Sequence, residues 1–141
     1  MTTDSTNSAG TMNELVSGRF AALVGVEFVS VTAEEAVSRL VLRKELSNTR
    51  GVVHAGALVA MADTTCGAGC IAALPDGSSG FLTVELKSNF VAGVGEGVLR
   101  CTARPRHRGR STQLWEAVIE SEDSGRPVAF FGCTQLILYR D

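Results

Sequence analysis

The apolar residues of this chain recur with helical spacing near the N-terminus and with the spacing of strands further along. From Met12 onward they return every three or four positions, and Thr11 and Glu14 form a capping-box pattern in front of them. A short amphipathic helix is therefore expected from about Met12 to Val24. Residues 1–11 are polar, and we expect them to form a disordered tail.

Six segments have the residue types and the alternation that are typical of strands. Val26–Val31 and Ala36–Leu42 are separated by a short polar turn, which predicts a hairpin. The other four segments lie in the second half of the chain: Gly80–Val91, Gly97–Arg106, Ser111–Glu122 and Pro127–Tyr139. Because glycine-containing turns of hairpin length separate these four, each is expected to pair with its sequence neighbour as an antiparallel strand.

One long apolar segment, Ala55–Leu74, lies between the two groups of strands. It has no proline until Pro75 and is apolar on nearly every side, which predicts a buried helix rather than a strand. Asp63 near its centre argues against a membrane span. A helix that is apolar all round needs a sheet to cover it, so we expect an α+β fold in which a curved antiparallel sheet wraps a central helix. Residues 12–141 are expected to form a single domain.

Composition limits the partners of this domain. The 141 residues carry a net charge of −2, so the chain lacks the overall positive field that would hold a nucleic acid or an anionic membrane. The N-terminus has neither the basic start nor the apolar run of a signal peptide, and we expect a cytoplasmic protein. The last strand is apolar on both faces, which predicts contact with a second subunit in a homodimer or homotetramer.

The cysteines do not have the spacing of a metal site. Four are present without a C-x-x-C pair, and only two histidines could assist them. We therefore expect no bound metal and interpret the cysteines, which have apolar neighbours, as buried free thiols.

Asp63 is the residue of the central helix that most needs an explanation. A buried carboxylate costs several kcal/mol unless it is hydrogen-bonded, paired or placed at a cavity. It is either a structural carboxylate bonded to its neighbours or a catalytic one, since burial raises the pKa of a carboxyl group toward the range of a general base. Gly56, Ala60, Gly67 and Cys70 lie near its face of the helix. Such small residues leave room for a ligand, or for close packing against the sheet.

The start of the same helix is a second candidate site. His54 comes directly before it, and the backbone N–H groups near Ala55 and Gly56 carry the partial positive charge of a helix N-terminus. Such donors suit a developing oxyanion. His54 is interpreted equally well as a plain helix cap.

Four of the cationic residues gather in the turn Arg104–Arg110. Arginines in such a cluster suit bidentate contacts with phosphate groups. A solvated hairpin accounts for the same cluster.

These residues together carry a family resemblance. The pattern Asn48-x5-His54-Ala-Gly-Ala-Leu-x4-Asp63, followed by Thr64, resembles the active-site signature of hotdog-fold acyl-CoA thioesterases of the PaaI-like (phenylacetyl-CoA) type. The similarity extends over the chain after Thr11. It implies a hotdog fold in which the sheet wraps the long helix, two subunits join edge to edge, and the active site lies at their interface.

The resemblance also implies roles for single residues. Asp63 would be the general base or the nucleophile, and the Ala55 N–H, next to Gly56, would form the oxyanion hole. Asn48 would orient the attacking water or the substrate, His54 would brace the loop, and the hydroxyl of Thr83 would assist the water. Ala55 replaces the usual glycine here and keeps the backbone N–H.

For the substrate, the resemblance implies an acyl-CoA, with Arg106, Arg108 and Arg110 contacting the coenzyme A phosphates and no other cofactor. Two alternatives stay open. One is a hotdog hydratase or dehydratase that uses His54 together with Asp63. The other is a non-catalytic protein that binds or senses acyl-CoA.

Overall fold

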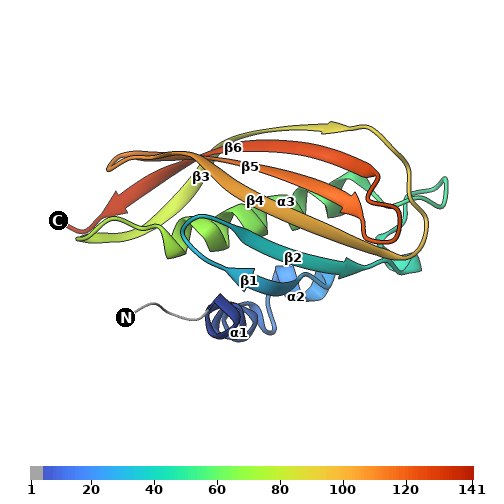
Figure 1. Ribbon diagram of the computed structural model, residues 1–141, viewed down its shortest axis with the longest axis horizontal. Coiled ribbons are helices and arrows are strands. Elements are labelled where there is room, and N and C mark those ends of the chain that lie inside the picture. Colours follow the sequence, from blue (N-terminus) through green and yellow to red (C-terminus); the bar gives the residue numbers. More distant parts are fainter. Residues whose placement is uncertain (1–4) are drawn as a thin grey trace.

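The computed structural model describes residues 5–141 and contains one long helix packed against one face of a six-stranded antiparallel sheet (Figure 1). The central helix is α3 (Ala55–Ala72). The strands run in the order β1-β2-β4-β5-β6-β3, so β1 and β3 form the two edges. Their bounds are β1 Glu27–Val31, β2 Ala36–Val41, β3 Ser78–Phe90, β4 Val98–Arg108, β5 Thr112–Ser121 and β6 Pro127–Tyr139. A curved antiparallel sheet around a central helix confirms the predicted α+β hotdog architecture.

The N-terminal region differs from the prediction. Two helices, α1 (Ser5–Val16) and α2 (Phe20–Val24), replace the single expected one, because Gly18 adopts a left-handed φ of 74° between them. The predicted disordered tail is wrong for residues 5–11, which are helical; residues 1–4 lie outside the described part. Asn13 attaches α1 to the sheet, since its side-chain amide exchanges two hydrogen bonds with the backbone of Phe28.

The predicted pairing of the third and fourth strands is also wrong. β3 pairs with β6 at the edge of the sheet, whereas β4 lies between β2 and β5. Segment 91–97 carries the chain across, and Val94 in its middle accepts a hydrogen bond from Val53 N–H, which ties it to the loop before α3. A short connection permits a hairpin, but tertiary contacts decide whether one forms. β6 is therefore an inner strand, and β3 forms the edge of the sheet opposite to β1.

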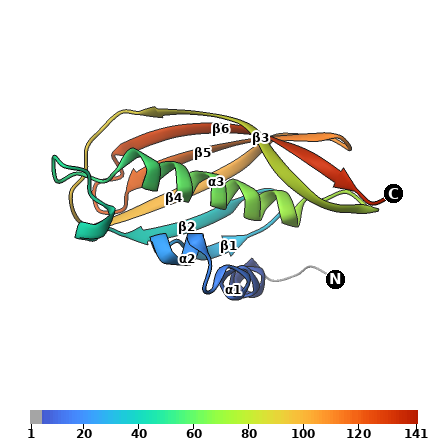
Figure 2. The ribbon, with the colours of Figure 1, turned by 180° about the vertical axis from the view of Figure 1, so that it is seen from behind.

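The helix α3 lies against the sheet (Figure 2). Small residues on this helix allow aromatic rings of the sheet to approach it closely. A Cβ atom at Gly69 would lie 2.4 Å from the ring of Trp115, and one at Gly67 would lie 3.0 Å from that of Phe81. Close packing thus explains Gly67.

The described helices include one, α3, that is long and apolar enough to cross a membrane, but 61% of it is buried inside the protein.

The four cysteines are free and buried, which confirms the prediction of free thiols. Burial raises the pKa of the Cys101 thiol to about 12, and burial together with the nearby Cys133 raises the pKa of the Cys70 thiol to about 12. A hydrogen bond with Cys133, together with burial, also raises the pKa of the Cys66 thiol. Thiols in this state are poor nucleophiles at neutral pH.

The contact between Gly69 and Trp115 gives a stability prediction. Gly69→Ala should lower the free energy of unfolding by about 1–3 kcal/mol, because an aromatic ring that is enclosed on all sides cannot move aside. The control is Gly10→Ala in α1, where a Cβ has nothing within 4 Å; there alanine should add about 0.5–1 kcal/mol through helix propensity. Urea unfolding followed by Trp115 fluorescence measures both, and equal stability of Gly69→Ala and the wild type would contradict the contact.

Candidate active site

The loop before α3 is shaped by Asn48. Its Oδ1 accepts hydrogen bonds from the backbone N–H of Arg50 and of Val52, at 2.8 and 3.3 Å. These bonds close a tight turn of the Asx type. The Nδ2 group of Asn48 has no hydrogen-bond partner among the described residues, so it remains available as a donor.

His54 is the N-cap of α3. Its Nδ1 accepts a hydrogen bond from Gly56 N–H at 2.7 Å, and its own backbone N–H donates to Leu46 O at 2.7 Å. A Cβ at Gly56 would lie 2.9 Å from Nδ1, which explains the glycine. The imidazole therefore holds the loop and the first turn together. Gly56 N–H is consumed by this cap, and Ala57 N–H donates to His54 O.

Ala55 N–H is left as the donor of the first turn with no partner in the described part of the chain. It adjoins a depression of 390 Å³, which is lined by Asn48, Ala55 and Leu58 on one side and by Phe90 and Val91 on the other. An unpaired N–H at a helix N-terminus carries partial positive charge and is suited to bind an anionic oxygen. The structure thus brings two of the predicted residues, Asn48 and Ala55, to one depression.

Asp63 lies two turns further along α3 and is half-buried. Its Oδ1 accepts a hydrogen bond from the hydroxyl of Thr83 at 2.9 Å. Thr83 belongs to the edge strand β3, so the structure brings together the carboxylate and the hydroxyl that the resemblance implied. The Thr83 hydroxyl also lies 2.7 Å from Oε1 of Gln135 on β6.

Sequence reasoning missed Gln135. It is 0% exposed and lies on the face of β6 that points toward α3. The available signal was a polar residue at an inward position of a strand whose other inward positions, such as Phe131 and Ile137, are apolar. That signal becomes specific only when the pairing of β6 with β3 is known.

The two parts of the site are separated within one chain. Ala55 and Asp63 are eight residues apart on the same helix, which places them about 12 Å apart along its axis. A reacting carbonyl must lie about 3 Å from both its oxyanion donor and its attacking group. This separation favours an arrangement in which two protomers each contribute one of the groups to the same carbonyl, even where Asp63 acts through one water.

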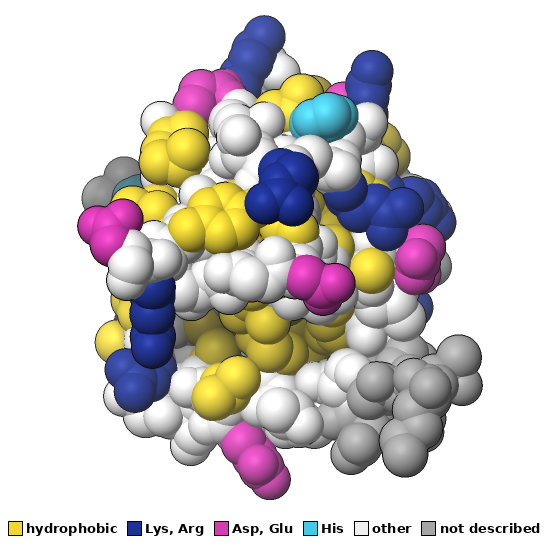
Figure 3. Space-filling view, turned by 90° about the vertical axis from the view of Figure 1, so that its left-hand side faces the viewer, with side chains coloured by type: hydrophobic (Ala, Val, Ile, Leu, Met, Phe, Trp, Pro, Cys, Tyr) yellow, Lys and Arg dark blue, Asp and Glu magenta, His cyan; other side chains and the backbone are white. Residues whose placement is uncertain are grey.

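The predicted phosphate-binding arginines lie at the other end of α3. The β4–β5 hairpin that carries them lies near the C-terminal end of this helix (Figure 2). There Gln113 donates a hydrogen bond to Ala73 O. Arg106 pairs with Glu116 at 2.7 Å, Arg108 donates to Ala33 O at 3.1 Å, and Arg110 lies over the ring of Tyr139. Figure 3 faces this end of the molecule and shows basic and acidic side chains side by side. The structure does not bring these arginines to the Asn48–Ala55 depression of the same chain.

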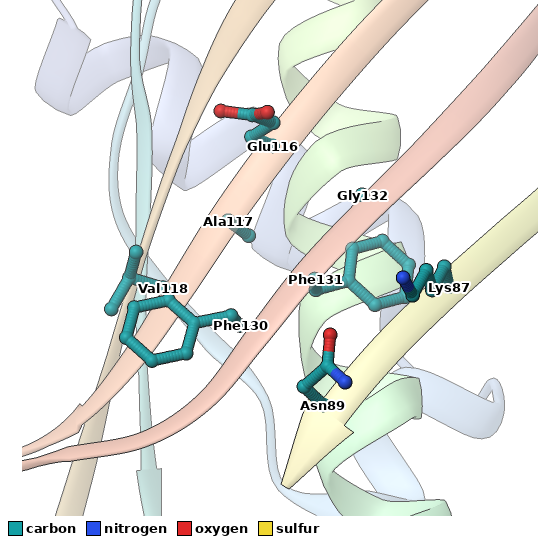
Figure 4. Close-up of a pocket in the computed structure, with 8 residues that line it drawn as sticks. All are labelled: Lys87, Asn89, Glu116, Ala117, Val118, Phe130, Phe131 and Gly132. Carbon is teal, nitrogen blue, oxygen red and sulfur yellow. The ribbon is translucent and has the colours of Figure 1, made fainter. Parts of the chain in front are cut away.

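Another depression, of 310 Å³, lies on the sheet over β3, β5 and β6 (Figure 4). Its lining includes Lys87, Glu116 and Phe130, and none of the residues predicted as catalytic.

No metal site is found among the described residues, which contain no group of three or more His, Cys, Asp or Glu side chains that could hold an ion.

Comparison with known proteins agrees with this architecture. The family model of the thioesterase superfamily matches residues 50–128, more than half of the chain. The Mycobacterium tuberculosis protein Rv1847 is 33% identical over 108 residues, covering 75% of this chain and 76% of the relative. The 1,4-dihydroxy-2-naphthoyl-CoA hydrolase of Listeria monocytogenes is 30% identical over 99 residues, covering 70% of this chain and 80% of the relative.

Solved structures give the same result. The M. tuberculosis structure of Rv1847/MT1895 superposes with a TM-score of 0.83 at 30% identity, covering 86% of this chain and 98% of the other. The thioesterase PA1618 of Pseudomonas aeruginosa, in a mutant form, superposes with a TM-score of 0.86 at 20% identity, covering 92% and 93%, and so shares the fold. On the family match and the identity to these relatives, the chain belongs to the thioesterase superfamily.

Proposed function

We propose that the protein hydrolyses an acyl-CoA thioester to a carboxylic acid and free coenzyme A, at sites that two protomers build together. The observation that carries the proposal is the hydrogen bond from Thr83 to Asp63 at 2.9 Å, which holds a half-buried carboxylate beside the edge strand β3. Family membership supports a thioester as the bond that is cleaved. The name of the L. monocytogenes relative supports coenzyme A as the thiol.

The chemistry follows from the groups that are present. Thr83 occupies one oxygen of Asp63, which leaves the other free to take a proton from water as the water attacks the thioester carbonyl. The oxyanion that forms is stabilised by Ala55 N–H and the helix N-terminus. Collapse of the tetrahedral intermediate breaks the C–S bond, and the departing thiolate recovers the proton from Asp63. Direct attack by Asp63 to form a mixed anhydride would use the same residues.

The separation of about 12 Å along the helix axis between Ala55 and Asp63 of one chain supports a site to which two protomers contribute. The edge strand β3 is the surface best suited to the second protomer. Leu86 and Phe90 share the inward face of β3 with Thr83, by their register with β6, yet they are 43% and 47% exposed. A second copy that pairs along β3, in a dimer or within a tetramer, would cover them and bring its own α3 alongside.

The alternatives make different predictions for one assay. Because the His54 ring is engaged as the cap of its own helix, the arrangement supports a hydratase or dehydratase less well than a hydrolase. Free coenzyme A, detected with a thiol reagent, should be released only by a thioesterase and not by a hydratase or by a binding protein. The cytoplasmic location, the lack of a cofactor and the phosphate contacts of Arg106, Arg108 and Arg110 stay predictions.

The first test concerns Asp63. Asp63→Asn should lower kcat about 100-fold or more, because the amide has no basic oxygen but still accepts from Thr83 and preserves the fold. Asp76→Asn, at an exposed position after α3, is the matched control and should leave kcat unchanged. Coenzyme A release from a panel of aryl, short-chain and long-chain acyl-CoA substrates measures both. A near-normal kcat for Asp63→Asn would remove Asp63 from the mechanism.

The second test concerns the shared site. Ala55→Pro deletes one N–H at the first helical position, where proline is tolerated, and His54 already has the extended ψ of 136° that precedes proline. We expect kcat to fall about 100- to 1,000-fold with little loss of stability. Light scattering should show a dimer or tetramer for both variants and the wild type.

Mixing the two inactive variants then tests whether the site spans two chains. After unfolding and refolding together, Asp63→Asn and Ala55→Pro should recover about a quarter of wild-type activity, because about half of the dimers are mixed and each mixed dimer has one intact site. No recovery from mixed dimers that have been shown to form would contradict a site built from two protomers.

The third test concerns the arginines. If Arg106 binds a coenzyme A phosphate, Arg106→Ala should raise KM roughly 3- to 10-fold with little change in kcat, because the contact is exposed and remote from the thioester. Arg104→Ala is the matched control, since Arg104 is equally exposed on the same strand and pairs with Glu35. The defect should vanish on acyl-pantetheine substrates, which lack the nucleotide. Equal defects on both substrates would exclude the phosphate contact.

A further inference from the structure

A continuous hydrogen-bonded chain leads from Asp63 into the core. Asp63 on α3, Thr83 on β3 and Gln135 on β6 are joined by contacts of 2.9 and 2.7 Å, and Thr83 and Gln135 are register partners on neighbouring strands. Gln135 is 0% exposed, and its Nε2 donates to Cys133 Sγ at 3.4 Å. The amide thus has a polar neighbour at each end, whereas Asp63 has no further protein hydrogen bond among the described residues.

The Thr83 hydroxyl has one proton and two acceptor oxygens within reach. It can donate to Asp63 Oδ1 or to Gln135 Oε1, but not to both at once. When Asp63 is a carboxylate, donation to Asp63 is favoured, because a hydrogen bond to a charged oxygen is the stronger one. When Asp63 carries a proton, Gln135 offers the hydroxyl an alternative acceptor. A side chain without this oxygen would leave the Thr83 hydroxyl held by Asp63 alone.

We infer that Gln135 is a positioning residue: it fixes the Thr83 hydroxyl and accepts a hydrogen bond from it when Asp63 has been protonated, and thereby directs the other oxygen of Asp63 to the attacking water. No bond other than hydrogen bonds changes at Thr83 or Gln135, since the Thr83 proton stays on its oxygen and only turns. This inference rests on the proposed hydrolysis. It adds to it a residue that does not touch the substrate.

The chain supplies a matched control in Gln113. Gln113 is also 0% exposed and lies directly opposite Gln135 on β5. Its amide is bonded just as fully, donating to Ala73 O at 2.9 Å and accepting from Trp115 Nε1–H at 2.8 Å. None of these partners is Thr83 or Asp63. Replacing either glutamine by methionine removes a buried amide of similar volume, so the two changes should affect stability alike, and only one should affect the Asp63 carboxylate.

The experiment is a double-mutant cycle on coenzyme A release. Gln135→Met should lower kcat roughly 3- to 10-fold with KM within about twofold of wild type. Thr83→Val should lower kcat at least as much, and Gln135→Met added to Thr83→Val should cause no further loss, because Gln135 acts only through Thr83. Gln113→Met should leave kcat within about twofold of wild type in both backgrounds. Thermal melting of each variant checks the fold, and Gln135→Asn, whose shorter side chain withdraws the amide from Thr83, replaces Gln135→Met if the latter does not fold.

The outcomes separate the inference from the proposed function. Coenzyme A release by the wild type with an unchanged kcat for Gln135→Met would overturn the inference alone. Losses that multiply in the Thr83→Val background, or an equal loss for Gln113→Met, would show a general effect on packing and would also overturn it. If the wild type releases no coenzyme A from any acyl-CoA, the proposed function and the inference fail together.

Discussion

A carboxylate in the middle of an apolar helix is the constraint on which the site depends. Asp63 needs a hydrogen-bond donor, and the fold supplies it from the edge strand through Thr83. Thr83 can reach Asp63 because β3 leaves its expected position beside β4 and pairs with β6 instead. The same pairing places Thr83 against Gln135. The pairing of β3 with β6 thus determines both the strand order at this edge of the sheet and the environment of the carboxylate.

Local pattern predicted the elements well and their arrangement less well. The central helix and all six strands lie within about two residues of their expected bounds, since periodicity and turn residues act locally. The position of β3 could not be read from the sequence, because segment 91–97 is short enough for a hairpin and is directed elsewhere by a contact with Val53. The start of α1 was missed because its polar residues form a helix whose Ala9 packs into the core.

In the candidate site, too, the residues that depend on local contacts could be predicted from the sequence, and those that depend on non-local contacts could not. The sequence spacing of Asn48, His54 and Ala55 is short, so it was sufficient to predict a loop followed by a helix N-terminus. The PaaI-like subtype of the family resemblance stays a prediction. Gln135 becomes relevant only through a contact with a residue 52 positions away. The small residues of α3 were ambiguous for the same reason. Only the position of Phe81 shows that Gly67 serves packing and not a ligand.

One side of α3 is not covered by the sheet of its own chain. This explains why the proposed active site and the proposed contact with a second protomer would use the same surface. Ala55 is exposed, and Val59 and Asp63, each four residues further on, are half-buried; such spacing places all three on one stripe of the helix. The stripe borders β3, whose inward Leu86 and Phe90 are also exposed. Water would otherwise screen both the base and the oxyanion donor, and screening weakens electrostatic stabilisation. A second copy along β3 would exclude that water, so in the proposed dimer covering the apolar edge and completing the site would be the same event.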